Sequence, residues 1–270
     1  MLIFYLLIFI FGLFIGSFLN CVIYRLEQGE SFLKGRSYCP NCKHQLAWYD
    51  LLPVLSFLFL RGRCRYCKKP ISWQYPIVEL FTGIVFILPF FSYSFFKGGV
   101  LGADTSSLIN YIYYLLIFCF LIIIFVYDLK HYIILDKVLL PTIVISFLYL
   151  IINSQLSIIN HQPSIINYIL SALGASALFL FIYLISKGKW LGFGDVKLVI
   201  LLGLFLGWPK ILLAIFLSFI IGGIIGTGLV LFSKKKLKSE VPFAPFLIIG
   251  TLIAFLWGGP IIGWYSNLVF

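Results

Sequence analysis

The sequence MLIFYLLIFIFGLFIGSFLNCVIY, residues 1–24, carries no charged side chain, and the first charge is Arg25. A run of about 20 apolar residues can cross the hydrocarbon core of a bilayer as an α-helix. A secretory signal peptide normally starts with basic residues and ends at a small-residue cleavage site, and this stretch has no basic start. We therefore expect residues 1–24 to form a retained first transmembrane helix.

The whole chain has the composition of a membrane protein. Of its 270 residues, 62% are apolar, and the mean hydropathy is +1.08, whereas soluble domains are about 45–50% apolar. This excludes a soluble cytosolic enzyme and a disordered protein. Seven more apolar runs follow, at residues 76–96, 108–127, 138–152, 167–186, 196–208, 210–232 and 243–266. We predict an all-α polytopic membrane protein with about eight transmembrane helices.

Basic residues are concentrated between the first two apolar runs. Residues 25–75 hold nine lysines and arginines against three acids, which is typical of a cytoplasmic loop and places the amino terminus outside. With eight spans, eighteen of the twenty basic residues lie inside, and only Lys97 and Lys210 lie outside. The net charge of +11 therefore indicates membrane topology and a lipid bilayer as partner, not nucleic acid.

Two apolar runs have unusual features. The apolar core of residues 198–208 has only 11 residues and could be re-entrant, but the basic cluster at 234–238 would then lie outside. We interpret it as a span. The glycines at 222, 223, 226 and 228 indicate close helix packing and not a phosphate loop. The chain thus divides into a first helix (1–24), a cytoplasmic loop (25–75) and a seven-helix region (76–270).

Four cysteines of the loop form two Cys-x-x-Cys motifs, which we call the knuckles. Cys39 and Cys42 form the first and Cys64 and Cys67 the second, separated by 21 residues. Thiolates are soft donors that suit tetrahedral zinc, and a small polar loop needs a clamp to hold a shape. The spacing predicts one structural zinc ion, since four protein ligands leave no open position for a catalytic water.

Other interpretations of these cysteines stay open. Two disulfides would use the same residues, although a cytoplasmic loop lies in a reducing compartment. His44 could replace one thiolate, or be an exposed loop residue. Cys21 and Cys119 lie in apolar runs and are expected to pack there.

Two aspartates lie where an apolar run meets the cytoplasmic face. Asp128 ends the run at 108–127, and Asp195 closes the sequence GFGD at 192–195. A carboxylate near hydrocarbon is costly, which makes it a candidate functional group. Two carboxyls in a semi-dry site can share a proton, one acting as general base on water and the other polarising a carbonyl. Gly192 and Gly194 would let backbone or substrate approach the second acid.

The same acids also have a structural interpretation. Each could cap a helix or pair with a nearby lysine, Lys130 or Lys197. Asp136 competes with Asp128 for the first position, and spacing does not decide between them.

Six motifs in this order resemble the type IV prepilin leader peptidases, which belong with the GxGD intramembrane aspartic proteases. They are GSFLN (16–20) with Tyr24 and Arg25, the two knuckles, YPIVEL (75–80), DLKH (128–131), GFGDVKL (192–198) and PFAPF (242–246). Two positions depart from the family pattern: Leu135 precedes Asp136 where the family usually has proline, and Ala244 replaces a usual glycine.

The resemblance implies that Asp128 and Asp195 are the catalytic pair, supported by Gly192, Gly194 and Lys197. It implies cleavage of prepilin or pseudopilin leaders at the cytoplasmic face of the inner membrane by the region 76–270. Many members of the family then methylate the new amino terminus, with S-adenosylmethionine as the methyl donor. The resemblance associates the zinc loop at 25–75 with these methylating members.

For methylation the acceptor amine must be neutral, so a nearby acid that takes its proton would help. Glu79, at the start of the second apolar run, is the candidate for this role. Two other functions remain open: a leader peptidase without methyltransferase activity, and a proton-coupled transporter, because acids inside membranes also mark proton relays.

Overall fold

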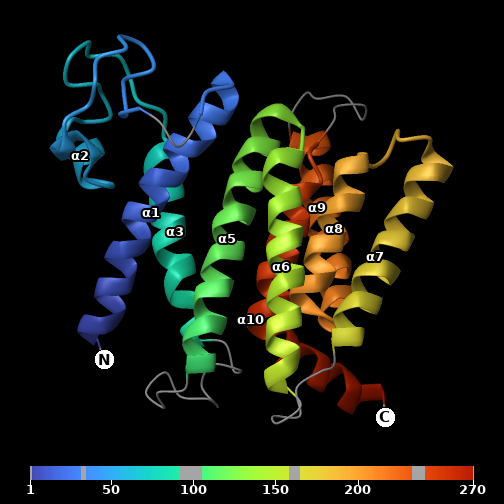
Figure 1. The fold of residues 1–270 in the computed structure, drawn as a ribbon. Helices are drawn as coiled ribbons and strands as arrows, with labels where there is room; N and C mark the ends of the chain where they lie inside the picture. Colours follow the sequence, from blue (N-terminus) through green and yellow to red (C-terminus); the bar gives the residue numbers. More distant parts are fainter. Residues whose placement is uncertain (1, 32–34, 92–104, 158–164, 233–240, 270) are drawn as a thin grey trace. The chain divides into compact units, whose positions relative to one another are not determined.

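The computed structural model describes residues 2–31, 35–91, 105–157, 165–232 and 241–269, and its helices are shown in Figure 1. Within these ranges it has no β-strand, so the all-α prediction is confirmed there. The long helices are α1 (Leu2–Gln28), α3 (Gln74–Phe91), α5 (Thr105–His131), α6 (Asp136–Ser157), α7 (Ile165–Ser186), α8 (Phe193–Leu206), α9 (Lys210–Phe232) and α10 (Ala244–Val269). The cysteine loop contains the short helices η1 (Trp48–Leu51) and α2 (Leu55–Phe59).

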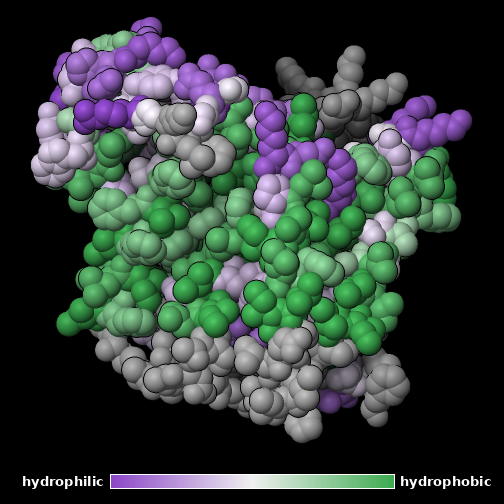
Figure 2. All heavy atoms as spheres, viewed as in Figure 1, coloured by the Kyte–Doolittle hydropathy of each residue, from purple (hydrophilic) through white to green (hydrophobic). Residues whose placement is uncertain are grey.

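Six helices of the described ranges are long and apolar enough to cross a membrane: α1, α5, α6, α7, α9 and α10. The other two, α3 and α8, are apolar but shorter. Figure 2 shows apolar residues over the sides of the helices and hydrophilic residues gathered over the cysteine loop. Every predicted apolar run thus contains a helix, and the count of eight membrane crossings stays a prediction. Lys34, Lys97 and the basic cluster at 234–238 lie outside the described residues.

The shortness of α8 has a physical reason. Its 14 residues span about 21 Å, less than the roughly 30 Å of a hydrocarbon core. Ten of them are buried, and the helix packs against α6, α7, α9 and α10. Because protein surrounds α8, its length does not have to match the thickness of the lipid.

The chain forms two compact units that meet within α5. Among the described residues, the first unit holds 2–91 and 105–123, and the second holds 124–269. The cysteine loop therefore belongs to the first unit, and both candidate aspartates belong to the second.

In the first unit, α1 and α3 pack closely along a line of small residues. A methyl group added at Gly16 would lie 2.7 Å from the Cα of Glu79, and one added at Gly12 would lie 2.8 Å from the Cα of Gly83. Such glycines let two helix backbones approach each other in a membrane. The Asn20 side chain then joins the helix ends by donating to the carbonyl of Tyr75 at 3.0 Å.

In the second unit, other glycines hold α8 and α10 against their neighbours. A methyl group at Gly203 of α8 would meet the backbone of Ala172 on α7, and one at Gly250 of α10 would meet Ala214 and Ser218 on α9. Within the described residues, the predicted packing role of the α9 glycines has support at Gly222 alone, because added methyl groups at 223, 226 and 228 would have no described neighbour within 4 Å. The glycine pattern alone could not identify the tight contacts.

This packing yields a test of Gly203. We expect Gly203→Ala to destabilise the protein by about 2 kcal/mol, because the new methyl group is forced against the Ala172 backbone. Gly223→Ala is the matched control: its methyl group meets open space, so stability should stay constant or rise by up to about 1 kcal/mol from helix propensity. Thermal unfolding of both variants in detergent would measure this, and equal unfolding midpoints would contradict the packing.

Candidate active site and metal centre

Asp128 lies in the last turn of α5 and is 4% exposed. The carboxyl end of a helix carries partial negative charge, so a carboxylate there is opposed by the helix dipole. A capping role therefore does not explain Asp128.

Asp195 lies in the first turn of α8 and is 8% exposed. Its Oδ2 accepts a hydrogen bond from the backbone N–H of Gly192, 3.1 Å away. Asp195 thus caps its own helix, as the structural interpretation predicts, and it lies where the helix dipole favours negative charge. Capping leaves the second carboxylate oxygen available for chemistry.

The two carboxyls belong to one site. Asp128 lies close enough to Asp195 for the two negative charges to repel each other. Asp128 also accepts a hydrogen bond from the backbone N–H of Ala244, the first residue of α10. The amino ends of α8 and α10 therefore both face this acid pair, and their exposed N–H groups stabilise negative charge.

The segment PFAPF at 242–246 builds the amino end of α10. Pro245 is tolerated in the first turn, where its missing N–H removes no intrahelical bond. The ring of Phe243 packs against those of Phe179 and Phe219, with centroids 6.1 and 5.1 Å apart. Ala244, whose N–H donates to Asp128, is fully buried. Sequence analysis did not identify the Ala244 N–H as a group of this site. The pattern that could have indicated it is a small residue, Ala244, directly before Pro245.

Asp136 has a different environment from Asp128. It begins α6, its side chain is 53% exposed, and both its oxygens accept hydrogen bonds from Lys197 Nζ at 2.8 Å. Burial distinguishes the two residues between which the sequence did not choose: Asp128 is buried beside Asp195, whereas Asp136 is an exposed ion-pair partner of Lys197. Lys197 thus joins α8, which carries Asp195, to the start of α6, which follows the helix that carries Asp128.

The two candidate glycines have different surroundings. A methyl group at Gly194 would lie 3.1 Å from the Cβ of Ile134, so this glycine lets the α5–α6 connection pack on the first turn of α8. Gly192 is exposed, and a methyl group there would meet only the Asp195 carboxylate within 3.6 Å and the Gly194 nitrogen at 3.9 Å. The approach to Asp195 is therefore open on the Gly192 side.

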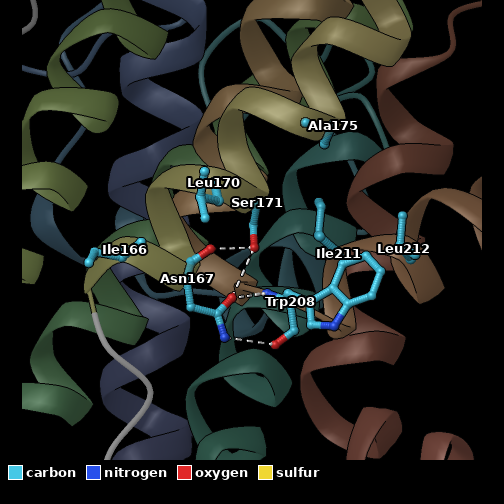
Figure 3. A pocket seen from close by; sticks show the side chains of 9 residues that line it. Ile166, Asn167, Leu170, Ser171, Ala175, Trp208, Ile211 and Leu212 are labelled. Atoms are coloured by element: carbon cyan, nitrogen blue, oxygen red, sulfur yellow. Dashed lines mark hydrogen bonds between the residues drawn. The ribbon is translucent and has the colours of Figure 1, made fainter.

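A pocket of about 490 Å³ lies at the opposite end of α8 from Asp195, between α7 and the start of α9 (Figure 3). Its polar groups satisfy one another: Asn167 accepts from the N–H of Trp208 at 2.9 Å and donates to the Trp208 carbonyl at 3.3 Å, and Ser171 donates to the Asn167 carbonyl at 2.6 Å. Among the described residues, those that line this pocket include no titratable side chain.

In the first unit, the two knuckles have the same backbone conformation. In the first, Cys39 donates to the carbonyl of His44 and accepts from the N–H of Lys43; in the second, Cys64 does the same with Lys69 and Lys68. The residue after each second cysteine, Lys43 or Lys68, has a positive φ of 57° or 59°. This turn directs both thiols of a knuckle to one side.

The four thiols meet at one point. Their sulfur atoms all lie within 4.8 Å of one another, and Cys39 Sγ lies 3.9 Å from Cys67 Sγ. Zinc–sulfur bonds of about 2.3 Å in a tetrahedron require sulfur atoms about 3.8 Å apart, so the cluster can hold one metal ion. His44 is outside it, exposed and stacked on Tyr66 with centroids 3.7 Å apart.

The two thiols of the first knuckle differ, and Cys39 is the one that favours the thiolate. Burial raises the pKa of the Cys39 thiol, but hydrogen bonds from the backbone N–H groups of Cys42 and Asn41 outweigh this effect and lower the pKa to about 7. In Cys42 a hydrogen bond from the backbone N–H of His44 lowers the pKa, but burial and hydrogen bonds with Cys39 and Cys67 outweigh it and raise the pKa to about 11. Metal binding needs the deprotonated form. The donor chemistry therefore fits a soft divalent metal such as zinc.

Glu79 is buried on α3 and holds part of the loop. Its Oε2 accepts from the N–H of Val54 at 2.8 Å, and Ser17 of α1 also hydrogen-bonds its carboxylate. Val54 has a positive φ of 60°, which is rare for a β-branched residue. Glu79 thus has a positioning role in this unit that the sequence did not indicate.

Arg25 fixes the beginning of the loop. Its side chain is buried and donates to the carbonyls of Ser31, Gly35 and Arg36 at 3.3, 2.9 and 3.2 Å. A buried guanidinium requires such partners. The sequence indicated a motif at Tyr24 and Arg25, but not that the Arg25 side chain hydrogen-bonds to the carbonyls of the loop.

Comparisons with known proteins agree with this arrangement. Residues 10–93 match the family model "Bacterial Peptidase A24 N-terminal domain", and residues 115–227 match "Type IV leader peptidase family". The first match contains both knuckles and Glu79, and the second contains Asp128 and Asp195. No solved structure matches the chain.

Several curated proteins are similar over nearly the whole chain. A protein of Legionella pneumophila is 33% identical over 97% of this chain and 94% of its own length. Those of Aeromonas hydrophila and Bacillus subtilis (strain 168) are each 31% identical, over 96% and 97% of this chain and 92% and 98% of their own lengths. All three carry the name "Prepilin leader peptidase/N-methyltransferase".

The cysteine cluster yields a test by metal analysis. We expect the purified protein to contain one zinc per chain, and Cys42→Ser to lose most of it, because three thiolates bind the ion less tightly than four. Cys119→Ala is the control, since Cys119 lies on α5 outside the cluster. Elemental analysis by mass spectrometry gives the ratio. Equal zinc in wild type and Cys42→Ser would contradict the four-thiolate site.

Proposed function

The chain belongs to the type IV leader peptidase family, and we propose that it removes the short basic leader from prepilins or pseudopilins and then N-methylates the new amino terminus. Cleavage takes place at the cytoplasmic face of the inner membrane, with the amino terminus of this chain outside. The observation that carries the proposal is the buried pair Asp128 and Asp195, set against the amino ends of α8 and α10.

The two carboxyls share the acid and base roles. Negative charges that repel each other in a buried site favour the state in which one proton serves both groups. The ionised carboxyl then takes a proton from water as the water attacks the scissile carbonyl, and the protonated carboxyl donates a hydrogen bond to the carbonyl oxygen. No covalent intermediate is needed.

The backbone around the pair positions these groups. The Gly192 N–H donates to one oxygen of Asp195, and the Ala244 N–H donates to the Asp128 carboxylate. These hydrogen bonds limit the rotation of both side chains. Lys197 and Gly194 hold the α5–α6 connection against α8. The exposed Gly192 leaves space for an extended substrate backbone next to Asp195.

The substrate carries a basic leader and an apolar helix. The helix packs laterally among the membrane helices of the enzyme, and the leader stays at the cytoplasmic surface with acidic side chains or lipid headgroups. Of the acids near this face, the Glu30 carboxylate accepts a hydrogen bond from the Tyr38 hydroxyl, which lies 2.8 and 2.7 Å from its two oxygens, and Glu79 is buried. Both are therefore engaged within the protein in this state.

The cysteine loop serves the second reaction. Zinc on Cys39, Cys42, Cys64 and Cys67 would hold the two knuckles together, which is a structural role. S-adenosylmethionine supplies the methyl group. Glu79 has one of two roles. It accepts the proton of the substrate's new amine, or it positions the loop that binds this amine, through its hydrogen bond with Val54.

The alternatives are less well supported. A proton relay needs acids toward the middle of the bilayer, whereas Asp128 ends α5 and Asp195 begins α8. The named relatives carry both activities in their names, which disfavours a peptidase without methyl transfer.

The acid pair is tested by three matched variants. We expect Asp128→Asn and Asp195→Asn each to lower the rate of prepilin cleavage by roughly 1,000-fold or more, since each removes a general acid or base. Asp136→Asn is the control and should retain most of the activity, because Asp136 is exposed and the oxygen of the asparagine can still accept a hydrogen bond from Lys197 Nζ. Single-turnover cleavage of a purified prepilin measures all three, and wild-type cleavage by Asp128→Asn would contradict the pair.

The two reactions should be separable. We expect the double variant Cys39→Ser and Cys42→Ser to lose methyl transfer while it still cleaves, because the cysteine loop and the acid pair belong to different units. Cleavage is followed by gel shift, and methylation by transfer of labelled methyl groups to a precleaved pilin. Unchanged methylation in this variant would remove the loop from the second reaction.

A further inference from the structure

The loop between α1 and α3 exposes a group of large apolar side chains, which we call the apolar ridge. Its members are Trp48, Leu55, Leu58, Phe59 and Trp73, which are 75%, 51%, 61%, 82% and 68% exposed. Three of the five belong to α2. Exposed clusters of this size and kind mark a surface that binds an apolar partner.

The ridge has a rigid base. On the inner side of α2, Phe57 is buried, with its ring 5.0 Å from the ring of Trp73. A methyl group at Gly62 would lie 3.1 Å from the same phenyl ring, so the chain after α2 closes tightly over it. One aromatic side chain thus fixes α2, and the outward residues are presented by a defined structure.

The position of α2 beside α3 indicates the depth of the ridge. Val54, directly before α2, donates to the carboxylate of Glu79 at 2.8 Å. Glu79 is five residues beyond Gln74, the start of α3, which is about 7.5 Å along the helix axis. Figure 1 shows α2 level with the first turns of α3. The ridge therefore lies beside an apolar helix near its end, which is where interfacial residues are expected in a membrane protein.

Basic side chains follow the ridge directly. Arg61 and Arg63 come two and four residues after α2, Lys68 and Lys69 follow, and all four are exposed. Tryptophan and phenylalanine with adjacent lysine and arginine are the residues that insert into the boundary between headgroups and acyl chains. The positive charge is complementary to acidic headgroups.

We propose that the apolar ridge is an interfacial anchor that inserts into the cytoplasmic leaflet, with Arg61, Arg63, Lys68 and Lys69 on the headgroups of acidic phospholipids. None of these residues is one of the four thiol residues or of the two aspartates, although Lys68 and Lys69 directly follow Cys67 in the chain. It holds the knuckles at the membrane surface, because η1 and α2 lie between Cys42 and Cys64 in the chain.

The test uses the full-length protein labelled with 5-fluorotryptophan in nanodiscs. The discs contain phosphatidylcholine alone or phosphatidylcholine with phosphatidylglycerol, and the fluorine signals of Trp48 and Trp73 are assigned by replacement with phenylalanine. We expect a lipid with a nitroxide near the headgroup to broaden both signals, more strongly in the acidic discs, and an aqueous gadolinium chelate to leave them sharp. Trp257, on α10, is the internal reference for a residue within a span.

Two variants separate the contributions. Leu58→Ser with Phe59→Ser should expose Trp73 to the aqueous chelate, while Arg61→Gln with Arg63→Gln should remove the difference between the two kinds of disc. Zinc content equal to that of wild type shows that the loop is still folded in each variant.

Three results would overturn the proposal. Broadening by the aqueous chelate in the wild-type protein would place the ridge in water. Protection of the signals from both probes would mean that protein covers the ridge. Equal broadening in neutral and acidic discs would exclude the role of acidic lipid.

Discussion

The second unit depends on one electrostatic constraint: two carboxyls are buried in a protein that is otherwise strongly apolar. Charge in such surroundings is tolerated only with fixed polar partners. Asp195 receives the Gly192 N–H, and Asp128 receives the Ala244 N–H, so the amino ends of α8 and α10 must meet the end of α5. The connection after α5 and the segment before α10 are positioned by this requirement. The N–H groups that stabilise the two carboxylates also fix the orientation of both side chains.

Helix packing satisfies this constraint because some backbones approach very closely. Gly203 brings α8 against Ala172 of α7, and Gly250 brings α10 against α9. With protein on nearly all sides, α8 can be shorter than the membrane is thick, and Asp195 in its first turn is buried within the protein. In the first unit, Gly16 lets the backbones of α1 and α3 approach each other closely. Beside this contact, Glu79 of α3 accepts a hydrogen bond from the N–H of Val54 in the loop.

The cysteine loop shows a different way to hold a structure. It has little core of its own: Phe57 under α2 is one of its few buried large side chains. Its shape rests on two identical turns, on Arg25 and Glu79 at its ends, and on four thiols that can share a metal ion. A small polar segment needs such linkages because the burial of its apolar surface alone is insufficient. Its exposed apolar side chains are therefore free to contact another surface.

Sequence alone determined the all-α membrane class, the place of each long helix, and the knuckles, because hydropathy and cysteine spacing act over short stretches of chain. It also identified Asp128, Asp136 and Asp195 as candidates. Only the tertiary structure decided that Asp128 lies beside Asp195 while Asp136 pairs with Lys197, that Ala244 supplies an N–H, and that open space surrounds most glycines of α9. These contacts join residues about 60 to 120 positions apart, and their choice depends on how whole helices pack, which no local pattern encodes.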